Sequence, residues 1–216
     1  MVAWKPDLIV GWASSFSDDN LGGAGFWNKR GCNVWALESM SGTRTVNGMI
    51  YDYTNLGCVF GIKEDTTAFI DEFRSKLANV QGTLSENGIG IAFYDGLDAE
   101  DFSEGVLWMY GGDTFIGNIM EHVGAENVYP GGGYSSLATV ADKSADIDVL
   151  FFVCYGDRTH DASYQMWMSD SALASCPVMS NGGLKDIKLS LAYGGDPSVL
   201  DMLDNLMETF GPPASD

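Results

Sequence analysis

The spacing of apolar residues predicts strands in the first part of the chain. Residues 7–11 form a short apolar run that ends in glycine, and residues 33–37 form a second run of the same kind. Runs of this length and composition are typical of buried strands in a parallel sheet. The glycine-rich stretch between them, from about residue 20 to residue 29, is expected to contain a short helix.

Two amphipathic helices are predicted next. Apolar side chains recur at three- and four-residue steps from Val46 to Phe60, and Gly61 marks the end of this helix. A second pattern runs from Phe69 to Val80 with its apolar residues on one face. It predicts a helix of about 20 residues, roughly 30 Å long, which is the longest regular element expected.

Strands and helices alternate in the remainder of the chain. The predicted strands are residues 89–94, 105–110 and 147–153, and the predicted helices are residues 114–123, 164–175 and 197–210. Such alternation indicates an α/β sheet with right-handed crossovers. We therefore expect an α/β fold in three parts: residues 1–61, a long helix within residues 62–87, and a larger unit of residues 88–216. With two clear strands, the first part is small for a lobe that folds alone.

The charge of the chain excludes several partners. Thirty acidic and 11 basic residues give a net charge of −19, which repels a nucleic-acid backbone and an anionic bilayer. No apolar stretch is long enough for a membrane helix, and residues 1–6 lack the pattern of a signal peptide. The four cysteines form no C-x-x-C pair, which argues against a zinc ribbon. A disulfide between Cys154 and Cys176 and buried free thiols both remain open.

Four stretches together resemble a known family. They are Trp-Lys-Pro-Asp-Leu-Ile-Val-Gly from Trp4, Tyr-Asp-Tyr-Thr-Asn-Leu-Gly from Tyr51 with Phe60-Gly61 after it, Ile-Met-Glu-His-Val-Gly-Ala-Glu-Asn-Val from Ile119, and Ser-Leu-Ala-Thr-Val from Ser136, followed by Asp-Ile-Asp-Val-Leu from Asp146. In order and spacing they are similar to the periplasmic-binding family that serves siderophore, haem and cobalamin importers. The resemblance implies two Rossmann-like lobes bridged by one long helix.

This resemblance also implies a function. Members are extracytoplasmic solute-binding components of ABC importers, located in the periplasm or anchored to the cell surface as lipoproteins. A member captures a ferric siderophore, haem or a corrinoid between its lobes and passes it to a membrane permease, without a cofactor and without chemistry on the ligand. No export signal is visible in this chain.

The chain departs from the family pattern at two places. Members have roughly 80 to 100 further residues before the strand that begins at Lys5-Pro6-Asp7, so the N-terminal lobe is expected to be truncated. An incomplete sheet exposes an edge, which predicts self-association. Members also dock on the permease through a glutamate on each lobe, and the position in the C-terminal lobe is occupied here by Ala138.

Candidate ligand-binding residues follow from the rule that ligands lie beyond the carboxyl ends of strands. This rule and the distribution of aromatic residues select Trp12, Ser14, Phe16, Trp108, Tyr110, Tyr155, Arg158, His160 and Trp167. The aromatic side chains would offer flat faces to a macrocycle or a chelate, or else pack in the core. Arg158 would bind a carboxylate or chelate oxygen, or else lie exposed in its loop. His160 or a tyrosine would suit haem iron.

Two alternative functions remain open on the sequence alone. The end of a strand, a turn and the start of a helix are predicted at Tyr110-Gly111-Gly112-Asp113-Thr114. If this turn bound phosphate, the chain would be a small α/β enzyme or nucleotide-binding protein. The second alternative is an interaction module derived from the receptor fold, with no role in transport. The sequence shows none of the common catalytic motifs, and its two histidines do not form a metal site. We therefore expect no catalytic residues and no bound metal.

Overall fold

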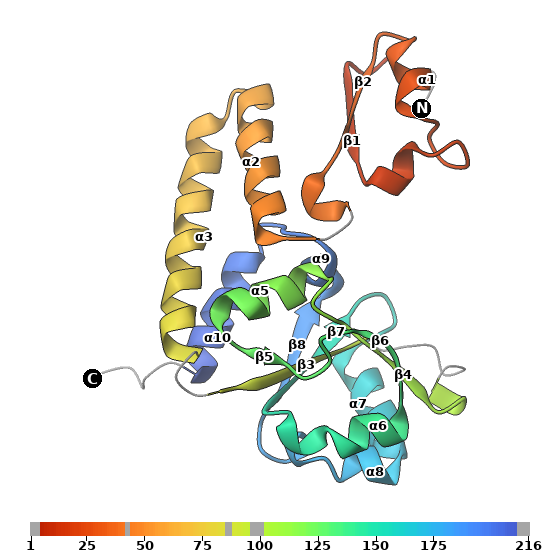
Figure 1. The fold of residues 1–216 in the computed structure, drawn as a ribbon, viewed down its shortest axis with the longest axis vertical. Helices are drawn as coiled ribbons and strands as arrows, with labels where there is room; N and C mark the ends of the chain where they lie inside the picture. The colour runs from red at the N-terminus through yellow and green to blue at the C-terminus, as the bar shows by residue number, and fades with distance from the viewer. Residues whose placement is uncertain (1–4, 42–43, 85–87, 96–101, 211–216) are drawn as a thin grey trace.

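The computed structural model describes residues 5–41, 44–84, 88–95 and 102–210 (Figure 1). Its first part, residues 5–41, is called the front unit below. Strands β1 (Leu8–Gly11) and β2 (Asn33–Ala36) pair in parallel, as predicted, with Ile9 opposite Val34. The 3₁₀ helices η1 (Ala13–Phe16) and η2 (Glu38–Met40) and the short helix α1 (Ala24–Asn28) complete the front unit.

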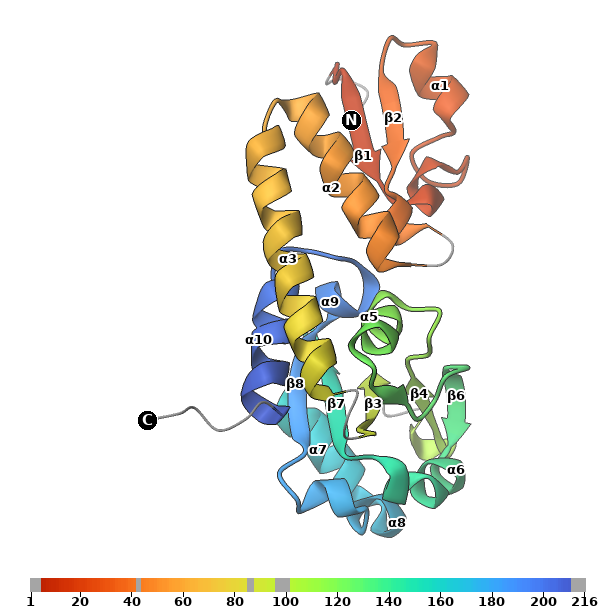
Figure 2. The ribbon, with the colours of Figure 1, turned by 60° about the vertical axis from the view of Figure 1, so that its left-hand side comes forward.

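A helical hairpin follows the front unit. Helix α2 (Val46–Phe60) begins at Thr45, whose side chain accepts a hydrogen bond from the Gly48 N–H at 3.0 Å, and ends at Gly61 with a left-handed φ of 70°. Helix α3 (Lys63–Leu84) then runs back beside α2 and continues along the main sheet (Figure 2). At 22 residues, α3 confirms the predicted long helix. Residues 85–87, the end of the predicted helical region, lie outside the described residues.

The main sheet has six strands. They are β3 (Gly90–Asp95), β4 (Val106–Met109), β5 (Glu126–Asn127), β6 (Gly133–Ser136), β7 (Val149–Cys154) and β8 (Leu184–Lys188). The order is β6-β4-β3-β7-β8, with β5 beside β3. Strand β4 is antiparallel to β3 and β6. The expectation of crossovers throughout is wrong here, because residues 96–105 between β3 and β4 are fewer than the dozen or more that a crossover needs.

Helices cover both faces of this sheet. One face carries α3, α5 (Phe115–Val123), α9 (Leu189–Tyr193) and α10 (Val199–Phe210); the other carries α6 (Leu137–Asp142), α7 (His160–Ser169) and α8 (Ser171–Ala174), with 3₁₀ turns η3 (Ser144–Asp146) and η4 (Pro177–Met179). Side chains alternate between the two faces along each strand. Phe93 and Phe151 therefore belong to the core under α3, α5, α9 and α10, whereas Tyr94 and Phe152 contact Trp167 of α7 on the other face. The helix predicted over 164–175 is interrupted at Asp170, whose carboxylate caps α8.

The front unit is poorly covered. None of the eight residues of β1 and β2 is fully buried, so the expectation of buried strands is wrong for this sheet. Trp27 and Cys32 are its fully buried apolar side chains, and neither main core includes a residue of the unit. It is attached through Asp52 of α2, whose carboxylate accepts the N–H groups of Glu38 and Ser39 at 2.9 and 2.8 Å.

Two further sequence questions are settled by the described residues. All four cysteines are free, so the disulfide between Cys154 and Cys176 is not formed. Among the helices that the structure describes, none has the length and apolar character needed to cross a membrane.

Candidate ligand-binding site

Two adjoining cavities lie near the junction of the front unit and α2. The larger is between the front unit, α2 and the segment around α9, and the smaller is between Arg44 and the turns at the end of β4. The larger, of about 500 Å³, is lined by Trp12, Met40 and Tyr53 on one side and by residues 189–190 and 193–197 on the other. The smaller, of about 290 Å³, is lined by Arg44, the end of β4 and the turn that follows it. Tyr193 lines both cavities. We call the two together the cleft.

Aromatic rings form the walls of the cleft. The Trp12 and Tyr193 ring centroids are 6.0 Å apart, and Tyr110 meets Tyr193 edge-on at 5.7 Å. Trp12 is 39% exposed, so much of its indole face is open to a ligand. The loop after Tyr193 packs closely on α2, because a Cβ on Gly195 would overlap the sulfur of Met49. The cleft therefore presents flat aromatic surfaces.

Arg44 lies between the two aromatic walls. Its guanidinium carbon is 4.6 Å from the centroid of the Tyr193 ring and 5.9 Å from that of Trp12. Its Nε is buried and has no hydrogen-bond partner in the described part of the chain. The backbone beside it is fixed, because Thr45 caps α2 and the N–H of Val46 donates to Asn118 Oδ1 of α5 at 2.9 Å.

A buried carboxylate, Asp95, organises the strand ends beside the smaller cavity. It accepts hydrogen bonds from Tyr110 Oη at 2.6 Å, from Tyr155 Oη at 2.9 Å and from Arg158 Nη1 at 3.0 Å. Burial raises the pKa of the Tyr110 phenol far above its ordinary value, and the bond to Asp95 raises it further. Tyr110 is therefore a neutral donor at physiological pH. Arg158 also lies over the Tyr155 ring at 4.6 Å, so both side chains are held in place.

The structure brings several of the predicted residues together. Trp12 lines the larger cavity, and Trp108 and Tyr110 line the smaller one. Tyr155 and Arg158 adjoin Tyr110 through Asp95. The expectation that Arg158 lies exposed in its loop is wrong, because its side chain forms a salt bridge with the buried carboxylate of Asp95.

Four predicted residues lie elsewhere. Ser14 is exposed and Phe16 is half-buried in η1, and neither is among the described residues that line the cleft. Trp167 is wrong as a ligand contact: it is fully buried, and its indole N–H donates to the Leu173 carbonyl at 3.0 Å. It lies on the face of α7 that packs on the sheet. His160 Nδ1 lies 2.8 Å from Asp186 Oδ1 of β8, outside the cleft.

Three residues of this site were not predicted from the sequence. Asp95 ends an apolar strand, so the rule that selected Tyr155 applies to it equally. Tyr193 ends the short helix α9, which was not predicted, and Arg44 precedes α2. For Arg44 the signal was its rarity, since the chain has four arginines. Among the described residues, no group of three or more His, Cys, Asp or Glu side chains is placed to hold a metal ion.

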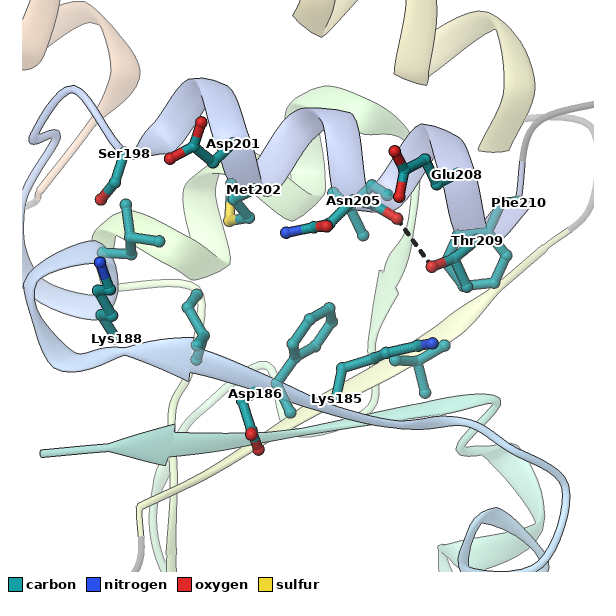
Figure 3. Close-up of a pocket in the computed structure, with 15 residues that line it drawn as sticks. Lys185, Asp186, Lys188, Ser198, Asp201, Met202, Asn205, Glu208, Thr209 and Phe210 are labelled. Atoms are coloured by element: carbon teal, nitrogen blue, oxygen red, sulfur yellow. Dashed lines mark hydrogen bonds between the residues drawn. The ribbon is translucent and has the colours of Figure 1, made fainter. Parts of the chain in front are cut away.

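A separate groove of about 500 Å³ lies between β8 and α10 (Figure 3). It is lined by apolar side chains such as Phe151, Ile187 and Met202 and by side chains of both charges, including Lys185 and Asp201. Its lining comes from the main sheet, α9 and α10, with no described residue of the front unit.

Comparison with known proteins identifies the fold. No protein-family model matches the sequence, and no curated protein matches it. A periplasmic binding protein from Veillonella parvula superposes with a TM-score of 0.82 over 98% of this chain and 66% of its own, at 22% identity. A periplasmic haem-binding protein from Pseudomonas aeruginosa gives 0.73, over 99% of this chain and 75% of its own, at 20% identity.

A third solved structure agrees with these two. It is described as an ABC-type Fe³⁺-hydroxamate transport system from Saccharomonospora viridis, with a TM-score of 0.72, 19% identity, and coverage of 98% of this chain and 71% of its own. The chain therefore has the fold of the periplasmic binding proteins of ABC importers, as the sequence resemblance predicted. It spans about two thirds of the length of the Veillonella parvula protein.

Proposed function

We propose that this chain is the extracytoplasmic solute-binding component of an ABC importer, which captures a ferric siderophore, haem or a corrinoid in the cleft without performing chemistry on it. The observation that carries the proposal is the pair of aromatic cavities that share Tyr193, of which the larger lies between the front unit, α2 and the segment around α9. Flat, rigid rings suit a chelate or macrocycle because they bury its faces at little entropic cost. The resemblance to binding proteins supports it independently.

The three parts of the fold have separate tasks in this proposal. The front unit would supply Trp12, and the main sheet would supply Tyr110, which Tyr155 supports through Asp95. The α2–α3 hairpin would hold the two walls at a fixed separation. Residues 62–87 would thus act as the bridge between lobes, with residues 1–61 and 88–216 on either side. A mostly preformed pocket would then bind the ligand without wide hinge closure.

A membrane permease would receive the ligand. Ala138 is exposed in the first turn of α6, and that turn contains no acidic residue. We therefore infer that docking on the permease does not use a carboxylate at this position of α6.

Titration of tryptophan fluorescence tests the proposed function. Ferric desferrioxamine B, haem and cyanocobalamin are added separately, and at least one is expected to quench the fluorescence saturably. Trp12→Ala is expected to weaken the best ligand about tenfold, because burying an aromatic face contributes roughly 1.5–3 kcal/mol. The matched control is Tyr51→Ala, an exposed aromatic residue of α2 that does not line the cleft. The proposal is contradicted if none of the three ligands binds.

The alternative function, a nucleotide-binding enzyme, depends on the turn after β4, and the hydrogen bonds of this turn do not favour phosphate binding. Gly111 packs backbone to backbone against Gly132, and the N–H groups of Gly112 and Thr114 already donate to the carbonyls of Pro130 and Gly111 at 2.9 and 3.2 Å. These groups would have to exchange partners to hold a phosphate. A nucleotide that raised the melting temperature, where no chelate or macrocycle did, would favour the enzyme.

Self-association through the front unit is the second prediction from this fold. The unit carries three basic residues (Lys5, Lys29, Arg30) and four acidic ones (Asp7, Asp18, Asp19, Glu38), a net charge of −1 against −19 for the whole chain. Two copies can therefore meet there with little repulsion and cover the apolar strands. Light scattering is expected to show a mass that rises with concentration, and Val10→Glu is expected to reduce it.

The control for this experiment is Met168→Glu. Met168 is an exposed apolar residue of α7, outside the front unit, so this substitution should leave the association unchanged. A chain that stayed monomeric at all concentrations would refute the prediction. Association combined with failure to bind any chelate would instead favour the interaction module.

A further inference from the structure

Arg44 lines the smaller cavity and forms no hydrogen bond or salt bridge with a described residue. Its Nε is buried and has no partner among the described residues, which is unfavourable for a donor on a charged group. The contacts of its guanidinium that the structure describes are with the faces of Tyr193 and Trp12. Such contacts support a cation but accept none of the N–H groups in its plane.

The acidic residues around the cleft do not neutralise Arg44. Asp113 borders the same cavity but is exposed and forms no described salt bridge with it. In the larger cavity, Asp52 accepts the N–H groups of Glu38 and Ser39. Asp196 accepts hydrogen bonds from the hydroxyl and the N–H of Ser198. No described carboxylate therefore forms an ion pair with Arg44, and its guanidinium can pair with an acidic group that enters the cleft.

We propose that Arg44 forms a subsite for an acidic oxygen group on the edge of the ligand, a carboxylate or a deprotonated chelating oxygen, so that the cleft selects anionic ligands. This inference rests on the proposed function and specifies the chemistry of its ligand. A planar guanidinium that lies on an aromatic ring can present its two terminal Nη groups to a pair of oxygens, which an arginine binds through two parallel hydrogen bonds.

The shape of the cleft fits this division. A flat ligand body would stack beside Trp12 and Tyr193 in the cavity of about 500 Å³, and its acidic group would extend past Tyr193 into the cavity of about 290 Å³. Thr114, the N-cap of α5, lines the smaller cavity as well. The amino end of this nine-residue helix also favours negative charge there.

The two arginines near the cleft have different tasks. Arg158 is paired with Asp95 at 3.0 Å, so its charge is offset and it serves to position Tyr155 and the strand ends. Arg44 has no such carboxylate among its described contacts, and it is fixed by the start of α2. A negatively charged ligand would therefore be recognised by Arg44 in a chain whose overall charge repels anions.

The test compares two probes that share a body and differ in acidic groups. Haem has two carboxylates, and haem dimethyl ester has the same ring with both blocked. Their affinities are measured by tryptophan quenching for the unmodified protein, for Arg44→Gln and for Arg74→Gln, an exposed arginine of α3 that serves as the charge-matched control. Ferric desferrioxamine B and its succinylated derivative, which has a carboxylate in place of the amine, form the corresponding pair for a protein that takes siderophores.

The unmodified protein is expected to prefer the acidic member of the pair that it binds by at least about tenfold. Arg44→Gln is expected to abolish that preference by weakening the acidic probe alone, and Arg74→Gln is expected to preserve it. Equal affinity for both members, or an equal loss of both in Arg44→Gln, overturns the subsite while leaving the proposed function in place. Failure of all four probes and of cyanocobalamin to bind overturns both.

Discussion

Replacing Asp95 by asparagine is expected to destabilise the protein by about 3 kcal/mol. The carboxylate is buried and accepts hydrogen bonds from Tyr110, Tyr155 and Arg158. Asparagine offers one acceptor atom in place of two and leaves the arginine without its counter-charge, and removing one partner of a buried ion pair costs roughly 3–5 kcal/mol. The lower end applies because the Arg158 side chain is 25% exposed.

Urea unfolding at neutral pH measures this change. The control is Asp157→Asn, an exposed acid in the loop after β7, for which a change within about 0.5 kcal/mol is expected. A loss of less than about 1 kcal/mol in Asp95→Asn would mean that the network does not hold the strand ends together. Ligand affinity should fall along with stability, since Tyr110 and Tyr155 lose their common anchor.

Replacing Gly117 by alanine is expected to destabilise the protein by about 3 kcal/mol, although alanine normally stabilises a helix. A Cβ at this position of α5 would overlap the Gly111 carbonyl oxygen and lie 2.8 Å from Gly112 Cα. Backbone atoms on a packed turn cannot move aside as a side-chain end can, so the helix must shift away from the cleft. The same shift would displace Thr114 and the wall of the smaller cavity.

The control for Gly117→Ala is Gly82→Ala in α3. A Cβ there meets no atom within 4 Å, so the usual helix preference should prevail and add about 0.5–1 kcal/mol of stability. Thermal unfolding of the two variants is therefore expected to move in opposite directions. A neutral or stabilised Gly117→Ala protein would show that α5 does not seat on the turn as described.

The elements that were predicted correctly are those whose signal is local. The long apolar stripe of α3 and the left-handed Gly61 at the end of α2 are encoded within a few turns of chain. Strands β6 and β8 were missed because each holds few apolar residues, Gly-Tyr-Ser-Ser and Leu-Lys-Asp-Ile-Lys. Both lie at the edges of the sheet, where a strand needs little apolar sequence to be stable.

The candidate site was predictable where it follows from strand ends and not where it depends on tertiary packing. Tyr110 and Tyr155 follow strands and meet at Asp95. Trp167 follows no strand, and sequence alone did not reveal which face of α7 packs on the sheet. Arg44 and Tyr193 reach the cleft because the starts of α2 and α5 are tied together and α9 ends beside them. That arrangement joins segments about 150 residues apart.

Backbone hydrogen exchange with and without saturating ligand tests the central claim most directly, with the ligand that quenches best in the titration. If the ligand occupies the cleft, amides of residues 109–114 and 193–196 should become protected together. Protection limited to residues 184–188 and 199–210, which border the groove between β8 and α10, would contradict the account, as would a saturated protein with no change at either place.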